Sequence, residues 1–439
     1  MTTSLTQSFF FLLAGVAIVI FLTAKYRVPA FFALLIACFV VGFGVHLSVA
    51  SIVTLIKEGF GRIMQSLAFI IILGTTLGVL LEHTGCTRVM ARAIMRKTGE
   101  RRAPLAMSLT GFIVGLPVFC DSGYIVLSGL NRSLAARAGG SIIALSVSLA
   151  TGLYVVHCLV PPHPGASSAA GTIGIDLGRL IFYGTLVAIP GMIVGHLWAL
   201  YASKKVKFKG RTEEYSTTSV VGPPTAIAFL PVIVPIALIA TNSFLNLENN
   251  NGIAHKTFAV LGEPVIALSV GVILTLMTTR WRGGELSRLL QESIEKSGGV
   301  LVIIGAGGAF GAVLAAAKIG EQFSSTLNLN SLGILFPFLL TFVLKTAQGS
   351  STVAIITAAS IVLPLLPSLG LDNDRGKLLS VLSMGAGSMM ISHANDAYFW
   401  VISKFSGLDM KTMLKTYSVA TIIAGSVTLL SVYILSLFI

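Results

Sequence analysis

Residues 115–123 read Gly-Leu-Pro-Val-Phe-Cys-Asp-Ser-Gly, and residues 160–165 read Val-Pro-Pro-His-Pro-Gly, within an otherwise apolar half of the chain. A second pair of such stretches follows about 233 residues later, at 345–352 (Lys-Thr-Ala-Gln-Gly-Ser-Ser-Thr) and 392–396 (Ser-His-Ala-Asn-Asp). In hydrocarbon an unpaired backbone N–H or C=O group is costly, so a broken helix survives only where protein, water or a ligand satisfies it. The four stretches are therefore expected to line a polar cavity.

The composition indicates a protein that crosses a membrane many times. Of the 439 residues, 54% are hydrophobic and only 11% are charged, and the mean hydropathy is +0.89. So much apolar surface cannot be buried in one soluble core, and the apolar runs have bilayer-spanning length, so the lipid bilayer is an expected partner. The formal charge of +13 comes from basic residues between apolar runs, as the positive-inside rule requires, so nucleic acid is not an expected partner.

Hydropathy predicts five crossings and one pair of short apolar arms in each half. The crossings are expected near 8–24, 29–47, 66–83, 141–175 and 179–202, and then near 225–245, 262–279, 297–317, 378–402 and 416–438. The short arms lie in 104–137 and 332–369. Because a helical arm of about 15 residues is about 22 Å long and the hydrocarbon core is about 30 Å thick, each pair is predicted to form a re-entrant hairpin.

Charges beside the hairpins predict their orientation. Basic residues flank the first hairpin, so its ends are expected to face the cytoplasm, whereas the flanks of the second are not basic on balance and are expected to face outside. The hydrophilic stretch 203–222 is interpreted as a cytoplasmic linker between an N-terminal repeat, 1–202, and a C-terminal repeat, 223–439. Since five is odd, the repeats should be inserted with opposite orientation. The prediction is an all-α polytopic membrane protein of two inverted-topology repeats, with helices broken at the midplane and both termini outside.

The broken stretches are the predicted substrate site of a secondary transporter. A hairpin tip exposes the N-terminus of its second arm, where free N–H groups and the helix dipole favour an anion. Two inverted tips would offer amide and hydroxyl donors to a carboxylate and its neighbouring hydroxyls. The candidate substrate-binding residues are Asp121, Ser122, Gly123, His163, Gln348, Ser350, Ser351, Thr352, His393, Asn395 and Asp396.

Two of these residues are also candidates for proton coupling. Asp121 and Asp396 are carboxylates at membrane depth, where ionisable groups are rare and usually functional. Structural alternatives stay open, because either aspartate could cap the helix that follows it and His163 could hydrogen-bond the broken backbone. His157 is expected to be a packing residue.

Missing motifs exclude several other functions. No G-x-x-x-x-G-K-S/T phosphate loop occurs, so transport should use an ion gradient or be passive. The glycines of 305–311 approach the GxGxxG spacing but lie in a predicted crossing, which favours close helix packing over dinucleotide binding. No cofactor is expected, no metal-ligand spacing is recognised, and the four cysteines form no CxxC pair.

Motifs along essentially the whole chain resemble the gluconate permease family of ion-coupled organic-acid carriers. They include Thr-Gly-Phe-Ile-Val-Gly at 110–115, Pro-Pro-His-Pro-Gly at 161–165, Ala-Gln-Gly-Ser-Ser-Thr-Val-Ala at 347–354, and Ser-His-Ala-Asn-Asp at 392–396. The resemblance implies a multi-pass symporter of the bacterial inner membrane, not an enzyme, which imports gluconate or a related hydroxy or sugar acid with protons.

One departure from the family bears on the substrate. Gluconate permeases typically place a glutamate before Val-Gly-Phe, whereas this chain has Asp-Ser-Gly-Tyr at 121–124, and it carries Asn131-Arg132 where the family tends to be apolar. The acid is retained but is one methylene shorter, so a small carboxylate is a firmer expectation than gluconate itself. The alternatives are uptake of D-serine or glycerate, Na⁺ in place of H⁺ as coupling ion, a passive anion channel, and an intramembrane hydrolase that uses Ser122 with a histidine. Oligomeric state is left open, with a homodimer as one option.

Overall fold

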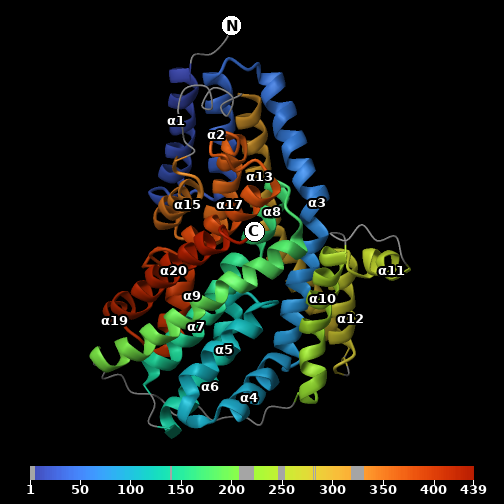
Figure 1. Ribbon diagram of the computed structural model, residues 1–439, viewed down its shortest axis with the longest axis vertical. Coiled ribbons are helices and arrows are strands. Elements are labelled where there is room, and N and C mark those ends of the chain that lie inside the picture. Colours follow the sequence, from blue (N-terminus) through green and yellow to red (C-terminus); the bar gives the residue numbers. More distant parts are fainter. Residues whose placement is uncertain are drawn as a thin grey trace.

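The computed structural model describes residues 5–138, 141–206, 222–245, 253–279, 281, 283–317 and 331–439, and every regular element among them is helical (Figure 1). Six helical segments of this part of the chain are long and apolar enough to cross a membrane: Val49–His83, Ile142–Ile173, Leu177–Lys205, Thr225–Ser243, Glu285–Ala316 and Met410–Leu435. The predicted all-α polytopic fold is confirmed. The inverted relation of the repeats and the sides of the termini stay predictions, and most of the linker 203–222 lies outside the described residues.

Two crossings belong to helices much longer than their apolar runs. α3 (Val49–His83) has 35 residues and α13 (Glu285–Ala316) has 32. These helices begin well before the predicted crossings at 66 and 297, because charged side chains end the apolar run without ending the helix. In α13, Lys296 and Glu292 lie at i, i+4 with their charged atoms 2.7 Å apart, a pairing that supports helix outside the apolar run.

The packing of α3 against α13 confirms the interpretation of the glycines in 305–311. A Cβ atom placed on Gly59 would lie 2.5 Å from the carbonyl oxygen of Gly308, so the two backbones touch through small residues. The other helices at predicted crossings are α1 (Leu5–Ala24), α2 (Ala30–Gly44), α9 (Leu177–Lys205), α10 (Thr225–Leu245), α12 (Pro264–Leu276) and α20 (Val419–Leu435).

A pair of consecutive helices occupies each predicted hairpin, and the re-entrant character of the pairs stays a prediction. α5 (Ala103–Gly115) leads to α6 (Cys120–Ala138), and α15 (Leu335–Gln348) leads to α16 (Ser351–Val362), which a short 3₁₀ turn (Leu363–Leu365) follows. Two predicted crossings are interrupted where the polar stretches predict it. α7 (Ile142–Leu159) stops before Pro161 and Pro162, and α8 (Pro164–Ile173) begins at Pro164, while residues 389–396 separate α17 (Asp374–Ser388) from α18 (Ala397–Ser406).

Several charged segments that the sequence does not predict as helices are helical in the structure. α4 (Cys86–Thr98) carries the basic cluster before the first hairpin and buries Cys86, Met90, Ala91 and Ile94 on its other face. This amphipathic face is hidden in a hydropathy plot, because the basic residues dominate the average. A 3₁₀ turn (Glu100–Arg102), α11 (Ile253–Leu261), α19 (Met410–Met413) and a π-helical turn (Leu414–Ser418) were likewise not predicted.

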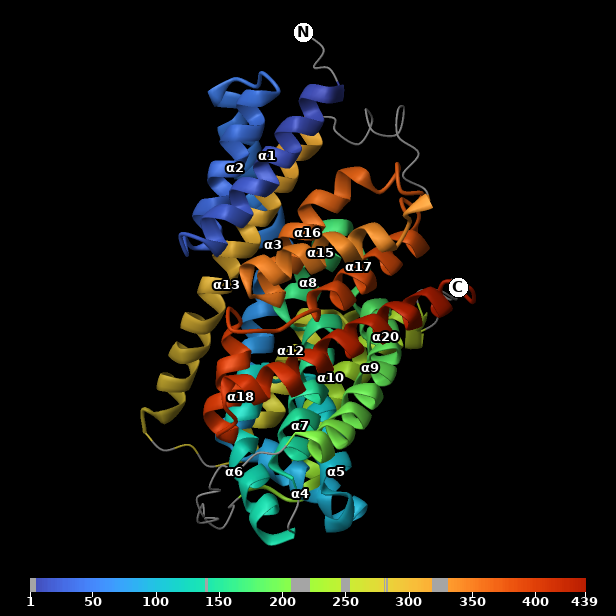
Figure 2. The same ribbon diagram turned by 90° about the vertical axis from the view of Figure 1, so that its left-hand side faces the viewer.

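Helices of the two halves interlock at the broken crossings. α8 of the first half packs against α16 of the second, and α18 of the second half packs against α6 of the first. Figure 2 shows α8 beside α16 and α17. The approach is close at Gly165, where a Cβ atom would lie 3.3 Å from the Cα of Thr352. Because helices of one half pack against helices of the other, all four broken stretches lie close together.

Candidate substrate site

The broken stretches surround a cavity of about 340 Å³. Its apolar wall comes from α13 and α16 (Val300, Ile303 and Ile356), and aromatic rings from three other segments complete it (Phe119, Tyr154 and Tyr398). Of the predicted substrate-binding residues, the structure brings these to the cavity: Asp121, Gln348, Ser350, Ser351, Thr352, Asn395 and Asp396. A few polar groups on a mostly apolar wall are typical of a site for a small ligand.

Asp121 brings a carboxylate to the cavity from the first turn of α6. The helix begins at Cys120, so Asp121 lies inside it and does not cap an arm that begins at Ser122. Its Oδ1 atom is buried and has no hydrogen-bond partner among the described residues. Because an unpaired buried oxygen is costly, this atom is well placed to receive a proton or a ligand.

The second hairpin tip presents the N-terminus of α16 to the cavity. Ser350 caps this helix by accepting the N–H of Val353 at 3.3 Å, and residues 350–353 line the cavity. N–H groups in the first turn of a helix have no partner within the helix, so they can bind an anion. At the end of α15, both amide atoms of Gln348 are buried without a partner in the described part of the chain, which suits them to a substrate hydroxyl.

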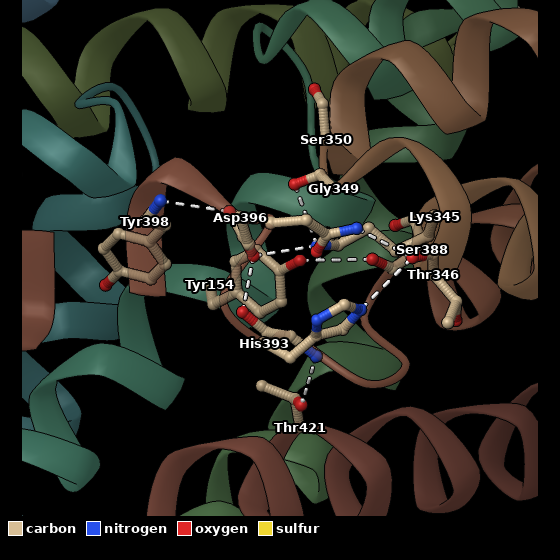
Figure 3. Close-up of polar contacts among 12 residues, drawn as sticks. Tyr154, Lys345, Thr346, Gly349, Ser350, Ser388, His393, Asp396, Tyr398 and Thr421 are labelled. Atoms are coloured by element: carbon tan, nitrogen blue, oxygen red, sulfur yellow. Dashed lines mark hydrogen bonds and ion pairs between the residues drawn. The ribbon is translucent and has the colours of Figure 1, made fainter. Parts of the chain in front are cut away.

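A buried ion pair lies behind this tip (Figure 3). The Lys345 ammonium is 2.8 Å from Asp396 Oδ2 and donates to the Gly349 carbonyl oxygen at 3.1 Å. Ser392 Oγ donates to the same carboxylate oxygen at 2.5 Å, and the N–H of Tyr398 donates to the other at 3.0 Å, so Asp396 caps α18. Both oxygens of Asp396 are therefore occupied and its charge is balanced.

Lys345 is a charged residue beside the site that the sequence prediction missed. Its side chain is completely buried. The signal was present, since a lysine in a short apolar arm needs a partner at membrane depth. That partner is 51 residues away in sequence, and only the folded chain brings the two together.

Four predicted residues do not line the cavity. His163 Nε2 lies 2.6 Å from the Gly115 carbonyl oxygen, so this histidine satisfies the broken end of α5, which was the structural alternative. His393 Nε2 lies 3.2 Å from the Thr346 carbonyl oxygen and fastens the break before α18 to the end of α15. Ser122 and Gly123 lie on α6 outside the lining. The structure therefore gives His163 and His393 a structural role, and direct substrate contact at the four positions stays a prediction.

For His157 the structure gives a cavity position that the sequence did not predict. It was expected to be a packing residue, but it lines the cavity from α7. Its Nε2 atom is 3.5 Å from Thr352 Oγ1, and its Nδ1 atom has no partner among the described residues. His157 therefore joins the candidate substrate-binding residues.

Replacing Gly349 by alanine is expected to destabilise the protein more than replacing Gly407. Both glycines adopt a left-handed backbone conformation, with φ of +78° and +75°. An alanine at either position therefore carries a backbone cost of about 1–2 kcal/mol. A Cβ atom at 349 would also collide with the Asn395 carbonyl, whereas nothing lies within 4 Å of one at 407. Overpacking of this kind costs roughly 1–3 kcal/mol more. Thermal unfolding in detergent measures the difference, and equal shifts would show that the tip moves freely away from Asn395.

Comparison with known proteins agrees with this architecture. Residues 8–438 match the family model described as GntP family permease. The chain is 33% identical to a gluconate permease of Pseudomonas aeruginosa over 95% of both chains, and 30% identical to the D-serine transporter DsdX of Escherichia coli O6:H1 over 98% of both. It is also 30% identical to the inner membrane permease YgbN of Escherichia coli K12, over 94% of this chain and 95% of the relative.

A solved transporter structure supports the same fold. The Alcanivorax borkumensis YdaH transporter superimposes with a TM-score of 0.63 over 89% of both chains at 15% sequence identity. At that identity the likeness shows the fold alone. The family match and the permease relatives show the rest: the chain belongs to the GntP family of permeases, and is a multi-pass transporter of the inner membrane rather than an enzyme.

Proposed function

We propose that the chain imports a small hydroxy or sugar acid, such as gluconate, by symport with one proton. The observation that carries the proposal is the Asp121 carboxylate, whose Oδ1 atom has no partner among the described residues, on the wall of the cavity that also receives the N-terminus of α16. The substrate carboxylate would bind the N–H groups of α16, and its hydroxyls would bind the amide of Gln348 and the side-chain oxygen of Asn395. The amide nitrogen of Asn395 already donates to the Thr346 and Ala347 carbonyl oxygens. The gluconate permease relative supports this choice of substrate.

Charge repulsion supplies the coupling. An ionised Asp121 and a substrate carboxylate about 4 Å apart would repel by about 4 kcal/mol at an effective dielectric constant near 20. The anion therefore binds well only when Asp121 carries a proton, and by linkage the bound anion favours the protonated form to the same extent. Asp396 was expected to share this role, but its pairing with Lys345 favours Asp121 as the coupling group.

A zwitterionic substrate such as D-serine is the second candidate. The cavity wall carries the Asp121 carboxylate, and an ammonium group on the substrate could pair with its Oδ1 atom, which has no partner in the described part of the chain. The D-serine transporter among the relatives supports this choice. In that case the ammonium takes the place of the proton on Asp121, and uptake should depend less on a pH gradient.

Uptake into proteoliposomes tests both candidates. Labelled gluconate, glycerate and D-serine would be offered under an imposed pH gradient, an imposed Na⁺ gradient or neither. We expect gluconate or glycerate to accumulate only under the pH gradient and to be recovered unchanged. Accumulation driven by Na⁺ would contradict proton coupling, equilibration without any gradient would indicate a passive channel, and a chemically altered substrate would indicate hydrolysis.

A further inference from the structure

A buried polar face of α6 leads away from the cavity. Asp121, Tyr124, Ser128 and Asn131 are spaced i, i+3, i+7 and i+10, so they share one face of the helix and extend over about 15 Å. Tyr124 is 0% exposed, Ser128 7% and Asn131 1%. A polar helix face normally points to solvent, but this one is packed against α7 and α18.

The polar atoms on this face are poorly satisfied by the protein. The Tyr124 hydroxyl lies within weak hydrogen-bonding reach of Asn131, Ser146 of α7 and Ser406 of α18. None of these approaches has the geometry of a full hydrogen bond, and the Tyr124 hydroxyl, both amide atoms of Asn131 and the Ser146 hydroxyl are buried without one to any described residue. Each such atom costs about 1–3 kcal/mol if it stays unsatisfied. Four neighbouring atoms in this condition point to a ligand between them.

Water fits this site better than a metal cation does. The Tyr124, Asn131 and Ser146 side chains are neutral, and the Arg132 guanidinium lies close enough to act on Tyr124. Arg132 Nε donates to the Phe405 carbonyl oxygen at 2.8 Å, which holds its positive charge at the end of α18. A site of neutral side chains offers a metal cation no carboxylate ligand. Water donates and accepts, and buried water typically makes about three hydrogen bonds to groups of this kind.

The site also adjoins the substrate cavity. Tyr398 lines the cavity, and the centroid of its ring is 6.1 Å from that of Tyr124. Asp121 lies one helical turn before Tyr124 on α6. At its far end the polar face approaches Arg132 and the basic end of the hairpin, which the positive-inside rule assigns to the cytoplasm.

We propose that water bound among Tyr124, Asn131 and Ser146 forms the route by which the Asp121 proton reaches the cytoplasm. The Asp121 O–H bond breaks, the proton passes to the first water, and each water hands a proton to the next, leaving Asp121 as a carboxylate. The route rests on the proposed symport, whereas the water site follows from the unsatisfied atoms alone. Asn131 is a position where the resembled family tends to be apolar, so the route would be a property of this chain.

The test separates net uptake from exchange. Exchange of internal for external substrate can proceed with the proton still bound, but net uptake requires its release. For Tyr124→Phe and Asn131→Leu we expect pH-driven net uptake to fall about tenfold or more, the low end of what a positioned proton-transfer group contributes, while exchange stays near the wild-type rate. Ser383→Ala is the matched control, since it removes a buried hydroxyl of α17 that also has no partner among the described residues.

Other results would overturn the proposal in recognisable ways. Equal losses of uptake and exchange in the two variants would mean a structural role, and unchanged uptake would mean that the proton leaves elsewhere. Hydroxyl-radical footprinting should label buried Tyr124 in the wild-type protein much more strongly than Phe310, which is also 0% exposed. Equal protection of both side chains would show that no water is bound beside Tyr124, which would contradict the proposal. If wild-type uptake ignored the pH gradient, the proposed symport would fail while the footprint could still be positive.

Discussion

Asp121→Asn is expected to abolish proton-driven accumulation while substrate exchange continues. Asparagine resembles the protonated carboxyl in shape and neutrality, so the cavity should still accept the anion. The variant cannot release a proton from this position, so the gradient no longer drives uptake. A gradient of about one pH unit supplies about 1.4 kcal/mol per proton, which allows about tenfold accumulation by the wild-type protein. The variant should only equilibrate its substrate, as measured by the ratio of internal to external label in proteoliposomes.

The matched control for this prediction is Glu292→Gln. Glu292 is an acid of α13 that is 43% exposed and pairs with Lys296, away from the cavity lining. Its substitution removes one carboxylate without touching the site, so accumulation should stay near tenfold. If Asp121→Asn accumulated substrate as well as the control, Asp121 would not be the coupling residue and the proposed mechanism would be wrong.

The tips and the broken crossings could be predicted from sequence because their causes are local. Pro161 and Pro162 interrupt the crossing, Pro164 begins the next helix, and Gly349 adopts a left-handed conformation that ends α15. Short arms between such residues are visible in one pass along the chain. The length of α3 was not predictable in the same way, because hydropathy detects the apolar run and not the helix that continues beyond it.

The chemistry of the site depended more on distant contacts. Asp121 could be singled out because a carboxylate in apolar sequence is rare. Whether Asp396 was free or paired was decided by Lys345 on another helix, and whether His163 or His157 faced the cavity was decided by which carbonyl or hydroxyl lay within reach. Pairings of this kind are tertiary, so residue types at a break identify the candidates but not their roles.

Breaking the Lys345–Asp396 ion pair is expected to cause the largest loss of stability. Removing one partner of a buried pair leaves an uncompensated charge and costs about 3–5 kcal/mol. Lys345→Met keeps the volume of the side chain and leaves Asp396 unbalanced, whereas Asp396→Asn leaves the ammonium unbalanced but keeps an oxygen for the N–H of Tyr398. Each variant should unfold at a clearly lower temperature in detergent, with reduced yield from the membrane.

The double variant decides whether charge balance or the specific contact matters. Lys345→Met with Asp396→Asn buries no net charge and keeps the cap of α18, so it should recover most of the stability that either substitution alone loses. Lys296→Met is the exposed counterpart, because it breaks a pair of the same 2.7–2.8 Å length in which both side chains are at least 38% exposed, and it should cost only about 0–1 kcal/mol. If the double variant were as unstable as the single ones, the hydrogen bonds of Lys345 to Gly349 and of Ser392 to Asp396 would hold the tip, rather than the balance of charge. Recovery of stability without recovery of transport would instead assign the ion pair to the positioning of Gln348 and Ser350 around the substrate.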